Sequence, residues 1–101
     1  MEIKIISTDK PTTIAVIGRI DTVTAPDFQK QMEAVFEEHQ QDLLLDCAEL
    51  SFLSSAGLRA LFMLARKSQA AKTSVTLQTV APNVRDVLKI SGFDNFFNII
   101  E

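Results

Sequence analysis

Two adjacent serines, Ser54 and Ser55, are the residues of this sequence best placed for chemistry on a side chain. They follow an apolar segment and a short loop, and they precede the helical pattern that starts with Ala56-Gly57-Leu58. A serine at a helix start accepts a hydrogen bond from a free backbone N–H group, so a structural role is the default. The same place favours added negative charge, because the helix dipole is positive there. A phosphate on Ser55 would therefore be well accommodated.

The sequence contains few residues suited to metal binding or to enzymatic catalysis. The sequence has one cysteine, Cys47, and one histidine, His39, which excludes a multi-cysteine zinc site and the two-histidine metal motifs. It has no Gly-x-Ser-x-Gly elbow, no Gly-x-x-x-x-Gly-Lys loop and no Gly-x-Gly-x-x-Gly turn. A serine hydrolase would need a base beside its nucleophile, and His39 lies at the far end of the predicted first helix. The residues favour a binding module without a cofactor over an enzyme, with Cys47 as a small core residue.

Length and composition indicate one small globular domain covering residues 1–101. Hydrophobic residues make up 47% of the chain and charged residues 23%, which is typical of a folded protein. Thirteen acidic residues against ten basic ones leave a net charge of −3, which argues against a nucleic-acid partner. No segment is long and apolar enough for a membrane span, and Met1–Lys4 does not resemble a signal peptide. We therefore expect a cytoplasmic protein, in keeping with its single free cysteine.

Hydrophobic periodicity predicts strands that alternate with helices. The second predicted strand ends at Gly18, the second helix starts at Ser54 or Ser55, and a loop over Ala48–Leu53 precedes it. The order β-β-α-β-α-β-α-β predicts a small α/β domain with a mixed, mostly parallel sheet and an antiparallel hairpin at its edge. The other two helices are predicted to start near Pro26, with Thr24 as N-cap, and at Pro82, and Gly92 ends the helix that starts at Pro82. The predicted strands are Glu2–Ser7, Thr12–Ile17, Leu43–Cys47, Thr73–Val80 and Phe96–Ile100.

A helical wheel divides the second predicted helix into two faces. The core side collects small and apolar residues: Gly57, Ala60, Leu61, Leu64, Ala65 and Ser68. The opposite side collects Ser55, Arg59, Phe62 and Arg66, with Met63 beside them. Single exposed apolar residues are ordinary. Aromatic, methionine and arginine side chains are also the types enriched at protein interfaces, however, so this face is a candidate docking patch next to the serine.

Three motifs in order give the chain a resemblance to a known family. The segment LLLDCAELSFLSSAGLRAL, residues 43–61, resembles the signature of STAS domains, in particular the bacterial anti-sigma factor antagonists. Gly18-Arg19-Ile20-Asp21 resembles the family's Gly-x-Leu/Ile-Asp after the second strand. Ala81–Arg85, together with Ile90–Phe93, resembles its closing Pro-helix-Ser-Gly stretch. The three motifs cover nearly the whole chain.

The resemblance implies a role for each matching residue. Ser55 matches the serine that a partner kinase phosphorylates, and Ser54 matches a position that is often Asp. Asp21 matches an acidic residue close to the phosphorylation loop, and Gly57 matches the glycine that lets the loop turn into the helix. The implied partner is an anti-sigma factor that is also a serine kinase. The unphosphorylated antagonist binds it, the phosphorylated form is released, and a metal-dependent serine phosphatase resets the cycle.

The sequence departs from the family pattern at two places and leaves two alternatives open. Ser54 in place of Asp removes one negative charge beside the acceptor hydroxyl, and many relatives continue into a final helix after the last predicted strand. Asp21 could merely close the turn after Gly18. A STAS domain that is never phosphorylated, serving as a scaffold subunit of a transport or sensory complex, is the alternative function.

Overall fold

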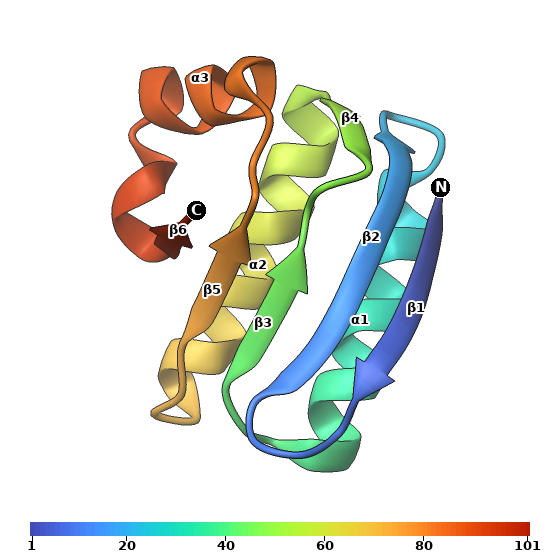
Figure 1. The fold of residues 1–101 in the computed structure, drawn as a ribbon, viewed down its shortest axis with the longest axis vertical. Helices are drawn as coiled ribbons and strands as arrows, with labels where there is room; N and C mark the ends of the chain where they lie inside the picture. The colour runs from blue at the N-terminus through green and yellow to red at the C-terminus, as the bar shows by residue number, and fades with distance from the viewer.

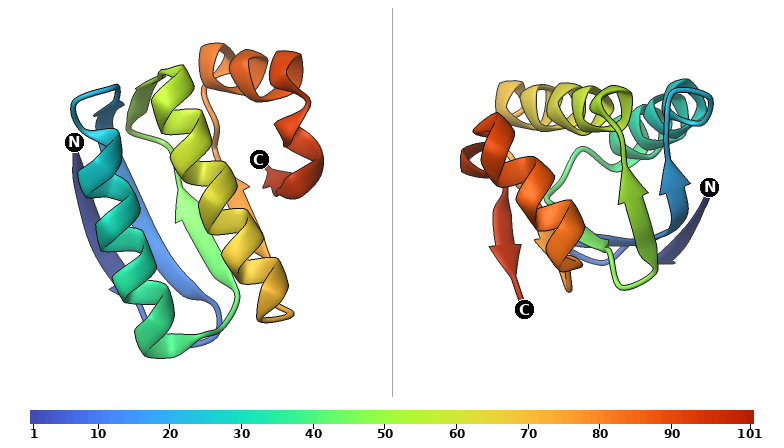
Figure 2. Two further views of the ribbon diagram at one scale, coloured as in Figure 1. Left: turned by 180° about the vertical axis from the view of Figure 1, so that it is seen from behind. Right: turned by 90° about the horizontal axis from the view of Figure 1, so that it is seen from above.

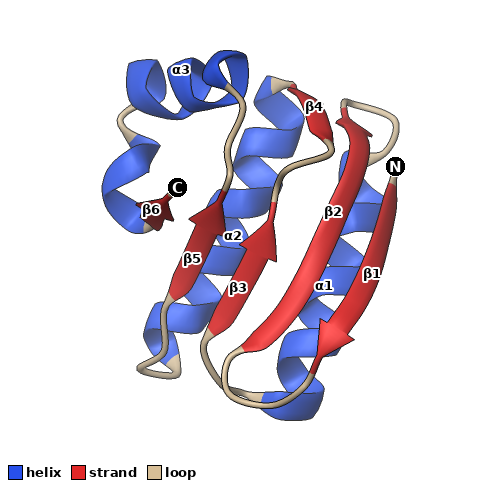
Figure 3. Cartoon of the chain, in the orientation of Figure 1, coloured by secondary structure: helices blue, strands red, loops and turns tan.

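A computed structural model describes residues 1–101 as a mixed α/β fold with three α-helices and a mostly parallel sheet (Figures 1 and 3). The sequence-predicted order of elements is confirmed, with one additional strand. The elements are β1 (Glu2–Ser7), β2 (Thr12–Ile20), α1 (Ala25–His39), β3 (Leu43–Asp46), β4 (Leu50–Leu53), α2 (Ser55–Ala70), β5 (Val75–Gln78), α3 (Pro82–Ser91), a 3₁₀ helix η1 (Phe93–Phe96) and β6 (Asn98–Ile100).

The sheet has the strand order β1-β2-β3-β5-β6, and β4 pairs separately with the end of β2. Only β1 is antiparallel to its neighbour, as the predicted hairpin requires, and every other pairing is parallel. The helices α1 and α2 lie side by side on one face of the sheet (Figure 2). Parallel strands joined through helices bring their carboxyl ends to one edge, and α1, α2 and α3 all begin at that edge.

The core lies between the sheet and the two long helices. Alternate residues of the strands point toward the helices, which explains the period-two burial of Ile14 and Val16 in β2 and of Leu43 and Leu45 in β3. The apolar stripe of α1 packs against these strand residues, and Phe28 of that stripe is fully buried. The residues between them along each strand are only partly buried, because no helix covers the second face of the sheet in the way that α1 and α2 cover the first.

Two predicted boundaries in the first half of the chain are wrong. The strand β2 continues through Gly18 to Ile20, because Gly18, with a φ of 97°, stays in the sheet and pairs with Leu50 at a register shift where Ser51 of β4 is the extra residue. The strand β2 pairs with β3 from Thr12 to Ala15 and with β4 from Gly18 to Ile20. The predicted loop Ala48–Leu53 therefore contains the strand β4, whose four residues are too few to give a periodic signal.

The C-terminal segment also differs from its prediction. Gly92 ends α3 in a left-handed conformation with φ 77°, as predicted. The last strand, however, begins at Asn98 and not at Phe96, because the chain first makes the 3₁₀ turn η1. This turn folds back toward α2 and brings aromatic side chains against it.

Candidate phosphoacceptor and docking site

Two loops meet at the carboxyl ends of β2 and β4. The strands run parallel there, with Ile20 opposite Leu53, and each strand leads into a helix within a few residues. The N–H group of Ser54 donates to the carbonyl oxygen of Ile20 over 2.9 Å, which ties the start of α2 to the end of β2. The sequence-predicted neighbours Asp21 and Ser54 are therefore placed on adjacent loops by this pairing.

The two serines have different environments. Ser54 is the N-cap of α2, has an extended backbone, and accepts a hydrogen bond on its Oγ from the N–H group of Gly57 at 3.2 Å. Ser55 is the first helical residue; its side chain is exposed, and its hydroxyl makes no hydrogen bond to the rest of the protein. The cap thus occupies the hydroxyl of Ser54 and leaves the hydroxyl of Ser55 accessible.

Gly57 is required by a close approach between α2 and β2. A Cβ atom at this position would lie 2.7 Å from Cγ2 of Ile20, 2.8 Å from the Ile20 carbonyl oxygen and 2.8 Å from Cδ1 of Leu53. Gly57 has ordinary helical geometry, so turning the loop is not what calls for glycine here. Its missing side chain lets the first turn of α2, with Ser55, sit directly on the end of β2.

Asp21 organises the loop between β2 and α1. Its Oδ1 accepts hydrogen bonds from the N–H groups of Val23 and Thr24, each over 3.0 Å. The Thr24 hydroxyl accepts from the Asp21 N–H group and donates to the Arg19 carbonyl oxygen, so Thr24 occupies the predicted N-cap position without capping α1 through its side chain. The hydrogen bond from the Thr24 N–H group is the main reason that the pKa of Asp21 lies below its ordinary value. These hydrogen bonds show that Asp21 closes the turn between β2 and α1.

A shallow groove of about 450 Å³ runs between the beginnings of α1 and α2 and contains the Ser55 side chain. Arg59 is its only charged lining residue. The groove is lined by Thr22, Ala25, Pro26, Gln29, Ser55, Ala56 and Arg59. The residues from the β2–α1 loop and α1 were absent from the sequence-based site, because nothing in their spacing connects them with Ser55.

The α2 docking patch is only partly as the wheel predicts. The predicted core residues are all buried, and Arg59, Met63 and Arg66 are exposed, Met63 by 42%. The prediction that Phe62 stands near solvent is wrong, because η1 covers it. The Phe62 ring stacks on Phe93 with centroids 4.5 Å apart and meets the edge of Phe96 at 4.9 Å, which leaves it half-buried.

One further exposed apolar side chain lies on the β2–α1 loop, next in the chain to Thr22 of the groove. Val23 is 85% exposed at the tip of the β2–α1 loop, and its N–H group is held by Asp21. The backbone hydrogen bonds of this turn hold the exposed residue in a fixed position beside the groove. An isolated valine between two threonines carries no periodic signal, so only the fold reveals its position.

The one histidine of the chain lies far from Ser55. His39, half-buried as predicted, ends α1, whereas Pro26 at the other end of the same helix lines the Ser55 groove. Thirteen residues separate the two, which is about 20 Å along the helix axis. Cys47 is buried, and burial, with a smaller effect from Asp46, raises the pKa of its thiol to about 12. The one histidine of the chain is therefore remote from the Ser55 hydroxyl.

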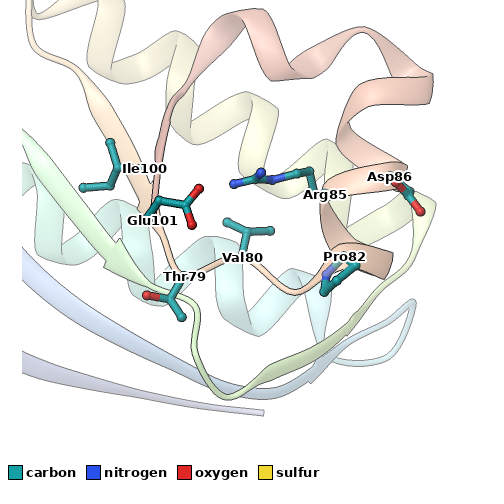
Figure 4. Close-up of a pocket in the computed structure, with 7 residues that line it drawn as sticks. All are labelled: Thr79, Val80, Pro82, Arg85, Asp86, Ile100 and Glu101. Carbon is teal, nitrogen blue, oxygen red and sulfur yellow. The ribbon is translucent and has the colours of Figure 1, made fainter.

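Another hollow, of about 370 Å³, lies where β5 and β6 end and α3 begins. Arg85 extends into it toward Glu101, and Asp86 points away (Figure 4). None of the sequence-predicted site residues lines this hollow. The structure holds no cluster of three or more metal-ligating side chains, and none of its helices has the length and apolarity to cross a bilayer.

Comparison with known proteins identifies the family to which this fold belongs. The fold is that of a small α/β domain with a serine-led helix at the carboxyl edge of its sheet. The sequence model of the STAS domain matches residues 2–101, and the chain belongs to the STAS domain family.

Its relatives include proteins named as anti-sigma factor antagonists. The chain is 28% identical to BtrV of Bordetella bronchiseptica, which bears that name, over 82 residues that make up 81% of this chain and 71% of BtrV. The crystal structure of an anti-sigma factor antagonist from Mycobacterium paratuberculosis superposes with a TM-score of 0.81 at 26% identity, covering 98% of this chain and 86% of that one. Phosphorylated SpoIIAA of Bacillus shares the fold, with a TM-score of 0.73 at 18% identity over 97% of this chain and 90% of that one.

Proposed function

We propose that this protein is an anti-sigma factor antagonist and that phosphorylation of Ser55 controls its binding to an anti-sigma factor serine kinase. The observation that carries the proposal is the contrast between the two serines. The Ser54 hydroxyl is engaged in capping α2, whereas the Ser55 hydroxyl is exposed and unbonded one residue later. A kinase needs an accessible hydroxyl, and the names of BtrV and the mycobacterial relative supply the class of partner.

The start of α2 can accept a phosphate without unfolding. The N–H groups of Ser55 and Ala56 belong to the first turn, where no intrahelical acceptor exists. An added charge of about −1.5 to −2 meets the positive end of the helix dipole there. The carboxylate of Asp21 on the adjacent loop opposes it, but Oδ1 of Asp21 is already occupied by hydrogen bonds. We therefore expect the phosphorylated form to keep its fold and to change only its surface.

The docking surface proposed for the unphosphorylated form combines α2 and the loop beside it. Arg59, Met63 and Arg66 are exposed side chains of α2, and Val23 projects from the β2–α1 loop. Burying a doubly charged phosphate against a partner costs desolvation unless it is paired, so phosphorylation favours release. A metal-dependent serine phosphatase would then restore the binding form. Because the net charge of the chain is −3, we propose that its partners are proteins and not nucleic acid or a membrane surface.

The test is phosphoryl transfer in a purified system. Serine-kinase anti-sigma factors from the source genome are incubated with the protein and ATP, and mass spectrometry maps the product. One phosphoryl group on Ser55, its absence in Ser55→Ala and its persistence in Ser54→Ala are expected. Transfer to Ser54, or no transfer from a kinase that binds the protein, would contradict the proposal and favour the scaffold alternative.

A further inference from the structure

Arg59 is an arginine beside the candidate site whose guanidinium has no partner within the fold. The guanidinium of Arg19 lies 4.2 Å from the ring centre of Phe52, and that of Arg66 lies 6.0 Å from the ring centre of Phe62. Arg59 is exposed and takes part in no hydrogen bond, ion pair or ring contact of the structure. Its charge is therefore available to a group that arrives from outside.

The position of Arg59 points to the Ser55 hydroxyl. The two residues are four apart on α2, so their side chains lie on one face of the helix, one turn from each other. Both line the groove between α1 and α2, and every other lining residue is uncharged. An anion formed on Ser55 would thus find a single cation in its own groove.

The acidic groups near this groove do not compete strongly for Arg59. The helix α2 contains three basic residues and no acidic one, although the chain as a whole is acidic. On the neighbouring elements, Oδ1 of Asp21 accepts the hydrogen bonds of its own turn. Asp27 in the first turn of α1 accepts a hydrogen bond from Nε2 of Gln31 over 2.6 Å. Neither carboxylate contacts the guanidinium.

We infer that Arg59 is the phosphate clamp of this protein: once Ser55 is phosphorylated, the Arg59 guanidinium pairs with the phosphate oxygens in the groove. The inference rests on the proposed phosphorylation of Ser55. Transfer of the phosphoryl group from ATP to Ser55 Oγ, with release of ADP and a proton, is the work of the kinase. An arginine can meet phosphate through two parallel N–H donors, which makes this pairing stronger than one with a point charge.

The pairing gives phosphorylation a second effect on the surface. The phosphate adds negative charge, and at the same time it withdraws the one free cation of the groove. A partner group that pairs with Arg59 in the unphosphorylated form would then lose that cation, which disfavours docking further.

A titration of the phosphate tests the clamp without any kinase. Phosphoserine is installed at position 55 during translation, and ³¹P NMR follows its second ionisation in the original sequence, in Arg59→Gln and in Arg66→Gln. Arg66→Gln removes the same charge at a position about 16 Å from Ser55 along the axis of α2, so it is the matched control. The midpoint in Arg59→Gln is expected about 0.4 pH unit above that of the other two proteins, the size of one helical i, i+4 ion pair. Arg59→Lys is expected to fall between them.

Equal midpoints in Arg59→Gln and Arg66→Gln would overturn the clamp, because the charge of Arg59 would then act no more strongly than a distant one. A melting curve of each variant verifies folding, and Arg59 is exposed, so both substitutions should leave the melting temperature unchanged. The outcome is separate from that of the proposed function. If no kinase modifies Ser55, the proposed function fails, while the installed phosphoserine still reports whether Arg59 holds a phosphate.

Discussion

Replacing Phe62 by alanine should destabilise the protein, because the ring is part of an aromatic cluster with Phe93 and Phe96. Removing a fully buried phenylalanine costs about 3–5 kcal/mol, and Phe62 is only partly buried, so the packing loss should lie below that range, at about 2 kcal/mol. The stacked contact at 4.5 Å and the edge contact at 4.9 Å each add about 0.5 kcal/mol or more. We expect a total loss of about 3 kcal/mol.

The loss is measured by thermal and urea unfolding followed by circular dichroism. For a domain of this size 1 kcal/mol shifts the melting temperature by about 4–8 °C, so Phe62→Ala should melt at least about 10 °C lower. Met63→Ala is the matched control, since this neighbour is 42% exposed and should change stability little. A double-mutant cycle between Phe62 and Phe93 should give a coupling of about 1 kcal/mol.

A specific result would refute this reasoning. If Phe62→Ala melts with the unaltered protein and loses only its affinity for the kinase, the ring belongs to the docking surface, and its contact with η1 contributes no stability. If Phe62→Ala unfolds earlier but binds normally at low temperature, Phe62 is a packing residue. The docking surface is then left to Arg59, Met63, Arg66 and the β2–α1 loop.

Three further predictions concern single side chains. Gly57→Ala should cost about 1–3 kcal/mol although alanine usually favours a helix, since its Cβ would lie 2.7 Å from Ile20 Cγ2; a higher melting temperature would contradict that close approach. Ser54→Ala should cost about 1 kcal/mol in urea unfolding as a lost N-cap, whereas Ser55→Ala should not, and equal losses would contradict this distinction. Burial, aided by Asp46, raises the pKa of the Cys47 thiol from 9.0 to about 12, so above pH 9 the unfolded state loses this proton first. The free energy of unfolding should therefore fall by up to about 1.4 kcal/mol per pH unit relative to Cys47→Ala, and parallel pH profiles would count against it.

Local patterns were enough to predict most of the elements. The β-branched stretch from Thr12, the apolar stripe of α1 and the placement of Pro82 and Gly92 around α3 each encode one element within a few residues. The inward face of α2 also follows from its sequence alone, because a 3.6-residue period and small side chains specify the buried side. Elements that depend on a distant partner were missed: β4 is a strand only because β2 continues past Gly18 to pair with it.

For the site around Ser55, too, some features follow from local sequence and others from the tertiary fold. The motif around Ser54 and Ser55 and the resemblance that it supports depend on residues adjacent in the chain, so the sequence alone indicated the family and a candidate acceptor. Why Gly57 must lack a side chain and what lies across the groove depend on β2 and α1, more than twenty residues away. The tertiary structure alone decided that Phe62 is covered, because Phe93 and Phe96 reach it only through the fold of η1 onto α2. Hydrophobic period reports which side of a helix is apolar, but only the packed chain determines which of those apolar side chains another segment covers.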